Sequence, residues 1–342
     1  MKRRLLQAIA GKQHGGAEIF FVRLATALTR AGENQSLVIR RDADRSRHLR
    51  DAGIAVTELG FRHRLDVATR FAFRREIARS RPQIVMTWMS RATQLCPPGD
   101  FVHIGRLGGY YDLKYYRHCN HLIGNTRGIV AYMIESGWPA KQAHYLPNFV
   151  PDLAGAAPVD RAAFETPVAV PLALALGRLH PNKGFDLLLD ALALTPELHL
   201  WIVGEGPLRG ALKQQAASLG IVDRVRFLNW REDVSALLAT ADFLVSSSRH
   251  EPLGNVVIEA WSARRAVVAT ATVGPSELIE PGVTGLLTPI APAALAGAMT
   301  TLSRDASLRD RLALGGRRAY EAEFTEDLVV ARYRRLFDEL AV

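Results

Sequence analysis

Residues 242–262 read DFLVSSSRHEPLGNVVIEAWS, and this stretch decides how the second half of the chain is interpreted. Its apolar start predicts a buried strand, its serines predict a polar loop, and the residues after Pro252 predict an amphipathic helix. Backbone N–H groups are left without helical partners where such a helix begins, here at Gly254, Asn255 and Val256. The positive end of the helix dipole lies at the same point, so the stretch predicts a site for a pyrophosphate.

The alternation of strand and helix extends outward from this stretch through both halves of the chain. In the second half, we expect strands at 172–177, 198–203, 225–228, 242–245 and 266–269, with helices at 184–193, 207–219, 232–239, 254–262 and 274–279. In the first half, we expect strands at 4–10, 36–40, 54–58, 83–88, 101–105 and 121–124, with helices at 17–30, 66–79 and 127–136. This order predicts an α/β protein with doubly wound parallel sheets.

The length of 342 residues exceeds one ordinary core and fits two domains. We place an N-terminal domain at 1–150, a Pro- and Ala-rich linker at 151–169, a C-terminal domain at 170–320 and a final helix in 321–342. Ligands of doubly wound sheets bind at the carboxyl ends of the strands. With two domains, the cleft between them is the expected ligand site.

Composition and charge narrow the class of protein. A hydrophobic content of 48% with 23% charged residues is typical of a soluble globular protein. The two cysteines, Cys96 and Cys119, lack metal-type spacing and suit a reducing cytoplasm. The net charge is +9, and basic residues concentrate before residue 82. Because we find no nucleic-acid recognition motif, we favour an anionic membrane surface or a phosphate-bearing ligand as the partner.

A family resemblance rests on Glu251 and Glu259. The spacing E-x7-E after a strand, with PLG inside it, resembles the signature of glycosyltransferase family 4, a retaining family of the GT-B fold. The stretches LGRLHPNKGFDLLLDAL and LWIVGEGPLRGALKQQAASLGI agree with that family in order. The resemblance covers about residues 170–290 well and is thinner before them, where Gly15-Gly16-Ala17-Glu18 is similar to the family's first loop.

The resemblance implies two Rossmann-like domains that face each other across a cleft. The N-terminal domain would bind the acceptor and the C-terminal domain a nucleotide sugar. The final helix would cross back onto the N-terminal domain, and residues 325–340 carry an apolar stripe that suits this role.

The resemblance also implies roles for the residues that match. Glu259 would bind the ribose hydroxyls and Glu251 the hydroxyls of the donor sugar. The residues beside the donor phosphates would be Gly15, Gly16, Leu253, Gly254, Asn255 and Val256. Gly204 and Glu205 would line the nucleotide pocket. The base would be bordered by Asn229, Trp230 and Arg231.

Arg178 and Lys183 would neutralise the leaving pyrophosphate. This argument also stands without the family, because fixed cations stabilise the negative charge that develops on such a leaving group. Arg suits a forked phosphate contact, and Lys supplies a point charge. Structural ion pairing is the alternative for each residue.

The catalytic base and the acceptor side are less determined. His103 stands on a strand where the family often has a histidine near the reacting carbon, although a lone histidine on a strand is more often simply packed. Arg106 could hold a phosphate or an acidic sugar, Tyr110 could stack on a sugar ring, and His14 is a further candidate. No carboxylate is placed as a nucleophile, so the donor phosphate itself would take the acceptor proton.

We expect no metal and no cofactor, because the nucleotide sugar is a substrate. Asp42-Ala43-Asp44 follows a strand as the metal motif of another glycosyltransferase class does, but the remaining pattern does not fit that class. A phosphorylase of the same fold would need a pyridoxal-phosphate lysine motif, which we do not find.

The expected function is transfer of a hexose, with retention, from a UDP- or GDP-linked donor to a glycan or glycolipid acceptor. Lipopolysaccharide core and a lipid-linked oligosaccharide are the acceptors considered, and the enzyme would be cytoplasmic and peripheral at the inner face of the cytoplasmic membrane. A nucleotide-sugar epimerase of the same fold is the alternative enzyme. A basic protein that binds membrane or nucleic acid is the alternative outside enzymes.

Overall fold

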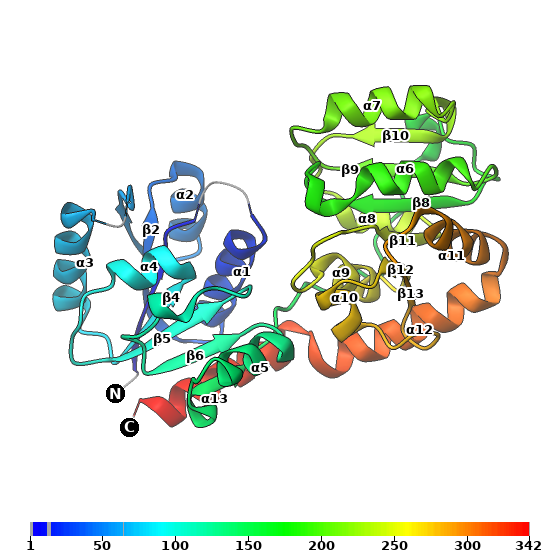
Figure 1. The fold of residues 1–342 in the computed structure, drawn as a ribbon. Coiled ribbons are helices and arrows are strands. Elements are labelled where there is room, and N and C mark those ends of the chain that lie inside the picture. Colours follow the sequence, from blue (N-terminus) through cyan, green and yellow to red (C-terminus); the bar gives the residue numbers. More distant parts are fainter. Residues whose placement is uncertain (1–2, 12–14, 64, 342) are drawn as a thin grey trace. The chain divides into compact units, whose positions relative to one another are not determined.

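The computed structural model describes residues 3–11, 15–63 and 65–341 and divides into two compact units (Figure 1). The first unit combines Met1–Phe149 with Glu326–Val342, and the second unit is Val150–Thr325. The segment 151–169, which we interpreted as a linker, is therefore part of the second unit. No helix in the described residues has both the length and the apolar character needed to cross a bilayer.

In its described residues, the first unit contains a seven-stranded parallel sheet in the order β3-β2-β1-β4-β5-β6-β7. The strands are β1 (Arg4–Ile9), β2 (Asn34–Arg40), β3 (Ala55–Leu59), β4 (Ile84–Trp88), β5 (Val102–Leu107), β6 (His121–Gly124) and β7 (Ala143–Tyr145). Ala8 of β1 pairs with Val38 on one side and Thr87 on the other. The strand order reverses at β1 and β4, so the loops that follow these strands flank the topological switch point.

Helices cover both faces of this sheet. They are α1 (Gly16–Arg30), α2 (Ala43–Asp51), α3 (Val67–Ser80), α4 (Met89–Leu95), α5 (Arg127–Glu135) and α13 (Glu326–Leu340). Leu5 and Ile9 of β1 belong to the core formed with α1 and α13, whereas Leu6 and Ala8 belong to the core formed with α3 and α4. This alternation follows from the two-residue period of a strand.

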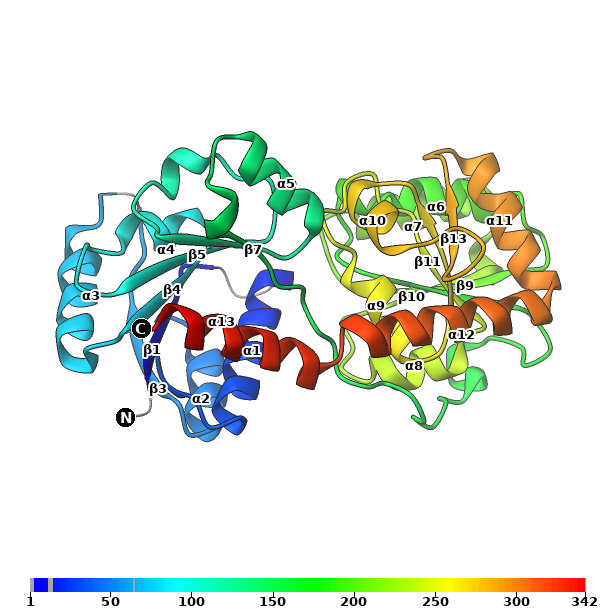
Figure 2. The ribbon, with the colours of Figure 1, turned by 90° about the horizontal axis from the view of Figure 1, so that it is seen from below.

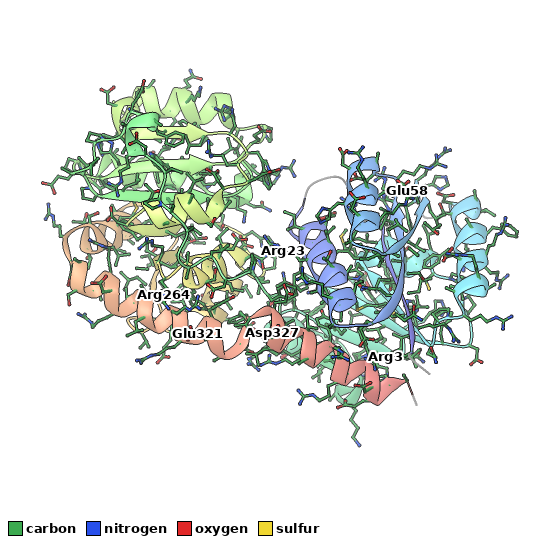
Figure 3. All side chains as sticks on the ribbon, turned by 180° about the vertical axis from the view of Figure 1, so that it is seen from behind. Arg3, Arg23, Glu58, Arg264, Glu321 and Asp327 are labelled. Carbon is green, nitrogen blue, oxygen red and sulfur yellow. The ribbon has the colours of Figure 1, made fainter. Side chains whose placement is uncertain are left out.

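The last helix, α13, completes the first unit. Tyr333 and Phe337 of α13 are fully buried against α1 and the sheet. Arg3, which lies beside α13 in Figure 3, forms ion pairs with Asp338 of that helix and, at 2.8 Å, with Glu33. The residues expected to form the final helix therefore pack on the sheet of the N-terminal half.

The second unit contains, among its described residues, a six-stranded parallel sheet in the order β10-β9-β8-β11-β12-β13. Its strands are β8 (Leu172–Leu176), β9 (His199–Val203), β10 (Val225–Leu228), β11 (Phe243–Ser246), β12 (Ala266–Thr270) and β13 (Leu286–Thr288). Its helices are α6 (Phe185–Ala193), α7 (Arg209–Ser218), α8 (Val234–Thr240), α9 (Asn255–Ser262), α10 (Val273–Leu278), α11 (Pro292–Arg304) and α12 (Ala306–Glu323). One core joins the sheet to α6, α7 and α11, and the other joins it to α8, α9 and α12, the side seen in Figure 2.

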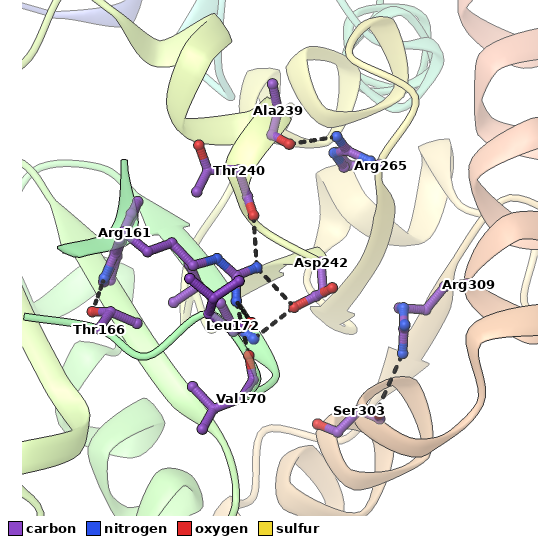
Figure 4. Close-up of polar contacts among 12 residues, drawn as sticks. Arg161, Thr166, Val170, Leu172, Ala239, Thr240, Asp242, Arg265, Ser303 and Arg309 are labelled. Atoms are coloured by element: carbon purple, nitrogen blue, oxygen red, sulfur yellow. Dashed lines mark hydrogen bonds and ion pairs between the residues drawn. The ribbon is translucent and has the colours of Figure 1, made fainter. Parts of the chain in front are cut away.

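The segment 151–169 is attached at the amino ends of these strands (Figure 4). Arg161 donates hydrogen bonds to the carbonyls of Val170 at 2.8 Å and Thr240 at 2.9 Å, and its guanidinium lies 3.3 Å from Asp242. Asp242 in turn accepts from the backbone N–H of Leu172 at 2.7 Å. This network explains why a Pro- and Ala-rich segment without periodicity is nevertheless ordered: its contacts are with the folded unit.

Candidate functional site

The candidate donor site lies on three loops at the carboxyl edge of the second sheet. These loops follow β8, β9 and β11, which are neighbours in the order β9-β8-β11. The strand order reverses between β8 and β11, and this reversal is where ligands of doubly wound sheets bind. The predicted Arg178, Lys183, Gly204, Glu205 and Glu251 therefore come from adjacent loops.

Two glycines let these loops approach one another. Gly204 has φ +142°, and a Cβ there would stand 2.1 Å from the Gly177 carbonyl oxygen. Gly184 has φ +60°, and its Cβ would stand 2.2 Å from the Ser247 carbonyl oxygen. Both positions combine a left-handed backbone with backbone contact, so only glycine fits. The loops after β8, β9 and β11 thus form one continuous rim.

Helix α9 begins at this rim. Gly254, its N-cap, has φ +93°, and no side chain caps the helix. Thr270 Oγ1 donates to the Ser248 carbonyl at 2.6 Å, and the Gly274 N–H donates to the Glu251 carbonyl at 2.8 Å. These two hydrogen bonds hold the loop that precedes α9. The N-terminus of α9 is therefore fixed in place with its backbone N–H groups directed out of the helix, as an anion site requires.

Lys183 and Glu251 form an ion pair at the rim. Both side chains are mostly buried, with 26% and 12% of their surfaces exposed. Ser247 Oγ donates to the Lys183 carbonyl at 2.9 Å, which holds the backbone of Lys183, and Ser248 Oγ lies 3.4 Å from Glu251 Oε2. A cation and an anion are thus placed together beside the N-terminus of α9.

The remaining donor-site candidates surround this pair. Arg178 is exposed directly after β8, and Glu259 lies on the less buried side of α9 with Asn255 and Val256. Asn229 and Trp230 are exposed after the edge strand β10. The side chain next to them is positioned more firmly: Arg231 makes two hydrogen bonds of 2.7 and 2.6 Å to Asp233 and lies over the Phe164 ring at 5.2 Å.

The sequence interpretation missed a second ion pair that supports the rim. The Arg249 guanidinium donates a hydrogen bond of 2.8 Å to the Asp186 carboxylate of α6. The backbone N–H of Arg249 donates to the Asn182 carbonyl at 2.8 Å. Asp186 and Arg249 are 63 residues apart, so no local pattern could have paired them. Only their shared place at the ends of β8 and β11 brings them together.

Comparisons with known proteins agree with this geometry. Residues 170–305 match the family described as glycosyl transferases group 1. The chain is 35% identical over 332 residues to the lipopolysaccharide core biosynthesis glycosyltransferase LpsE of Rhizobium meliloti (strain 1021), covering 94% of this chain and 95% of that protein. The chain belongs to the group 1 glycosyltransferases. The lipopolysaccharide core biosynthesis glycosyltransferase LpsD of the same organism is 33% identical over 330 residues, and the match covers 95% of this chain and 95% of LpsD.

Among solved structures, Anabaena HepE in complex with UDP matches with a TM-score of 0.87 at 22% identity, covering 98% of this chain and 100% of HepE. This likeness shows the GT-B fold. The group 1 glycosyltransferase type, the GT-B fold class and the enzyme type expected from the sequence are confirmed. The protein is accordingly a glycosyltransferase with two Rossmann-like units.

The first-unit candidates of the glycosyltransferase are placed differently from those of the second. Gly15 is the N-cap of α1 and Gly16 its first residue. A Cβ at Gly15 would stand 2.3 Å from Glu18 Oε2, so this glycine makes room for a buried carboxylate of the same helix. His14 lies outside the described residues.

His103 is not placed for catalysis. It is the second residue of β5, at the amino end of the strand, whereas ligands bind at the carboxyl ends. The ring is buried, and its Nε2 shares a hydrogen bond of 2.9 Å with Thr87 Oγ1. Burial lowers the pKa of His103 to about 4. The packed alternative is therefore correct, and the prediction of a catalytic role was wrong because strand parity and position cannot be read from one sequence.

Arg106 is also not an acceptor contact. Its side chain is only 2% exposed and lies over the rings of Phe20 at 4.7 Å and Trp88 at 4.3 Å. The guanidinium donates to Tyr333 OH at 2.8 Å and to Asn148 Oδ1 at 2.6 Å. Arg106 instead attaches α13 to the sheet, through a partner 227 residues away.

On the acceptor side, Tyr110 remains a candidate, and the structure adds Asn125. Tyr110 is exposed after β5, and its ring packs edge-on against Tyr132 at 5.4 Å. Asn125 follows β6, is buried, and its Oδ1 has no hydrogen-bond partner among the described residues. A buried acceptor without a partner is uncommon and suits a ligand group. The sequence interpretation missed Asn125, because Asn-Thr after a strand is also an ordinary helix start.

The stretch Asp42-Ala43-Asp44, which resembles a metal motif, has a structural role at the start of α2. Asp42 is the N-cap of α2 and accepts from the Arg45 N–H at 3.1 Å. In the described part of the chain, no three His, Cys, Asp or Glu side chains lie together as a metal site would require.

Proposed function

We propose that this glycosyltransferase moves a hexose from a UDP- or GDP-linked donor, with retention of configuration, to a lipopolysaccharide core or a lipid-linked oligosaccharide. The observation that carries the donor half is the Lys183–Glu251 ion pair beside the uncapped N-terminus of α9. The acceptor class is supported by the names of LpsE and LpsD, both lipopolysaccharide core glycosyltransferases.

The donor diphosphate would lie at the N-terminus of α9, with its charge offset by Lys183 and Arg178. Glu259, one turn further along α9 than Asn255, would accept hydrogen bonds from the ribose hydroxyls. Glu251 would accept from a donor-sugar hydroxyl and keep Lys183 directed at the phosphates. The exposed Asn229 and Trp230 would border the base.

In the proposed reaction, an acceptor hydroxyl oxygen bonds to the anomeric carbon from the face that the nucleotide leaves. The bond between that carbon and the phosphate oxygen breaks, and the acceptor proton passes to an oxygen of the departing β-phosphate. Lys183, Arg178 and the α9 N–H groups stabilise the charge that forms on the diphosphate. The step is proposed to need no metal, because these groups already supply positive charge.

On the acceptor side, Tyr110 and Asn125 would contact the sugar that is extended. An exposed aromatic ring packs against sugar C–H groups, and the buried Oδ1 of Asn125 can accept a sugar hydroxyl. We also propose that the enzyme works as a peripheral protein at the inner face of the cytoplasmic membrane, which its net charge of +9 supports.

The test is a screen of UDP-, GDP- and ADP-hexoses by calorimetry, followed by transfer to purified core oligosaccharide with and without a chelator. We expect one nucleotide to bind, activity that survives the chelator, and a product whose anomeric proton has the donor's configuration by NMR. An inverted product would refute the retaining mechanism, and loss of activity with the chelator would refute metal independence. Turnover of the nucleotide sugar without an acceptor would favour an epimerase.

A further inference from the structure

Three large apolar side chains are exposed on α3 and directly before it. Leu65, just before the helix, is 77% exposed, Val67 is 76% exposed and Phe71 is 71% exposed. Single exposed apolar residues are ordinary, but three within seven positions form a patch that indicates a partner. Figures 1 and 2 both place α3 at the outer side of its unit.

The periodicity of α3 puts these residues on the side away from the core. Thr69, Phe73 and Glu76 are buried and mark the inner side. Val67 and Phe71 are four residues apart and project from the opposite side. The helix therefore buries one side in its own unit and presents a second apolar stripe outward.

Arginines border this stripe on both flanks. Arg70 and Arg74 lie on one side of Phe71 and Arg75 on the other, and all three are exposed. We call Leu65, Val67, Arg70, Phe71, Arg74 and Arg75 together the α3 face.

The acidic residues of the same segment do not neutralise this face. Asp66 is buried and caps α3, accepting from the N–H groups of Thr69 and Arg62 at 3.0 Å each. Those backbone hydrogen bonds lower the pKa of Asp66 to about 2. Glu76 is buried, and its carboxylate accepts hydrogen bonds from Thr57 at 3.0 Å and from Arg79 at 2.7 Å. Both carboxylates point inward, so the outward charge of the segment is positive.

An apolar stripe between arginine flanks fits an anionic bilayer better than a protein groove or a nucleic acid. Helices that lie in the interface insert apolar side chains to the acyl boundary while basic residues stay at the phosphates. The 14 residues of α3 span about 21 Å, so the whole helix can lie flat on lipid. A nucleic acid would use the arginines and leave Leu65, Val67 and Phe71 in water.

We propose that the α3 face is the surface by which this protein docks on an anionic bilayer, with Leu65, Val67 and Phe71 inserted. The proposal deepens the peripheral location proposed above and rests on it. It makes no use of the donor site, so the two can be tested apart.

The test is co-sedimentation of the full chain with vesicles of phosphatidylcholine alone and of equal parts phosphatidylcholine and phosphatidylglycerol. We expect binding to the anionic vesicles only. Val67→Ser with Phe71→Ser, and separately Arg74→Glu with Arg75→Glu, should each weaken binding by about tenfold or more, since each basic residue near the surface contributes about fivefold. Arg311→Glu with Arg318→Glu on α12 makes the same charge change and should have a much smaller effect.

Circular dichroism and transfer to a water-soluble core oligosaccharide verify that each variant is folded and active. If the α3 variants bind like the unaltered protein, or if the α12 control loses as much, the α3 face is not the docking surface. Sedimentation velocity addresses another occupant: a dimer that dissociates in the Phe71 variant would overturn the proposal in favour of self-association. Failure of transfer with intact vesicle binding would count against the proposed function alone.

The depth of insertion gives a second readout. Phe71→Cys carrying a nitroxide label should become shielded from a water-soluble relaxation agent when anionic vesicles are added, while Arg318→Cys should not. The native Cys96 and Cys119 are buried, which favours selective labelling. A Phe71 label that stays accessible to the agent on bound protein would overturn the inserted orientation.

Discussion

The two units share a doubly wound parallel sheet, yet their candidate sites follow from the sequence to very different extents. In the second unit, Lys183, Glu251 and the start of α9 lie together at the carboxyl edge, and Lys183 there forms the ion pair that was the alternative to a phosphate contact. In the first unit, His103 lies at the wrong end of its strand and Arg106 is buried under α13. The difference shows that a site made of backbone turns and helix ends is local in sequence, whereas one made of side chains depends on packing.

The largest expected effect tests the donor side of this comparison. Lys183→Ala should lower kcat about 10²- to 10³-fold, because it removes a fixed cation from the developing diphosphate charge. Lys213→Ala, on the exposed side of α7, is the matched control and should leave kcat unchanged. Steady-state kinetics on both variants measures this. An unchanged kcat in the Lys183 variant would mean that its pair with Glu251 is only structural.

The next effect tests the packing assignment of Arg106. Arg106→Leu should lower the free energy of unfolding by about 3 kcal/mol, because hydrogen bonds to a buried charge and ring contacts are lost together. Tyr333→Phe removes one of those hydrogen bonds and should cost about 1 kcal/mol. Chemical denaturation measures both. A stable Arg106 variant with a raised acceptor KM would restore Arg106 to the acceptor site and weaken the contrast between the units.

A smaller effect is expected for Glu259. Glu259→Ala should weaken nucleotide binding about tenfold, since hydrogen bonds to a charged carboxylate contribute roughly 1.5–3 kcal/mol in favourable cases. Glu339→Ala, on α13, serves as the control and should leave the affinity as it is. Calorimetry with UDP and GDP gives both values. Equal affinities in the two variants would remove the ribose role.

The smallest effect concerns His103. Near neutral pH, His103→Asn should leave the pH dependence of kcat unchanged, because the ring lies away from the carboxyl edge. The pKa of His103 falls from 6.5 to about 4 on folding, so between these values the unfolded chain binds the extra proton. Stability should therefore fall as the pH drops from 6.5 to 4. The variant should lose part of that decline in thermal melts. Burial also lowers the pKa values of His121, His144 and His199, so these histidines should contribute to the decline that remains.

The fold was predictable where apolar periodicity is strong. The strands at the centres of both sheets and the helices α1, α6 and α9 lie within a residue or two of the ranges expected. The helix α2, with sequence ADRSRHLRD, was missed because it buries only Leu49 among its apolar residues. The helices α11 and α12 were also missed, as was the edge strand β13 (Leu286–Thr288), whose three residues are too few to show a period.

The sequence by itself determined the α/β class and the position of the candidate donor site. The strand, the polar loop and the helix N-terminus of residues 242–262 form one short-range pattern, and the alternation of strands and helices places the other loops at the same edge. Only the tertiary structure decided that Arg106 supports α13, that Asp186 holds Arg249, and that the apolar residues of α3 point outward. Each of these depends on which distant segments pack together, and packing is decided by the whole core rather than by neighbours in the chain.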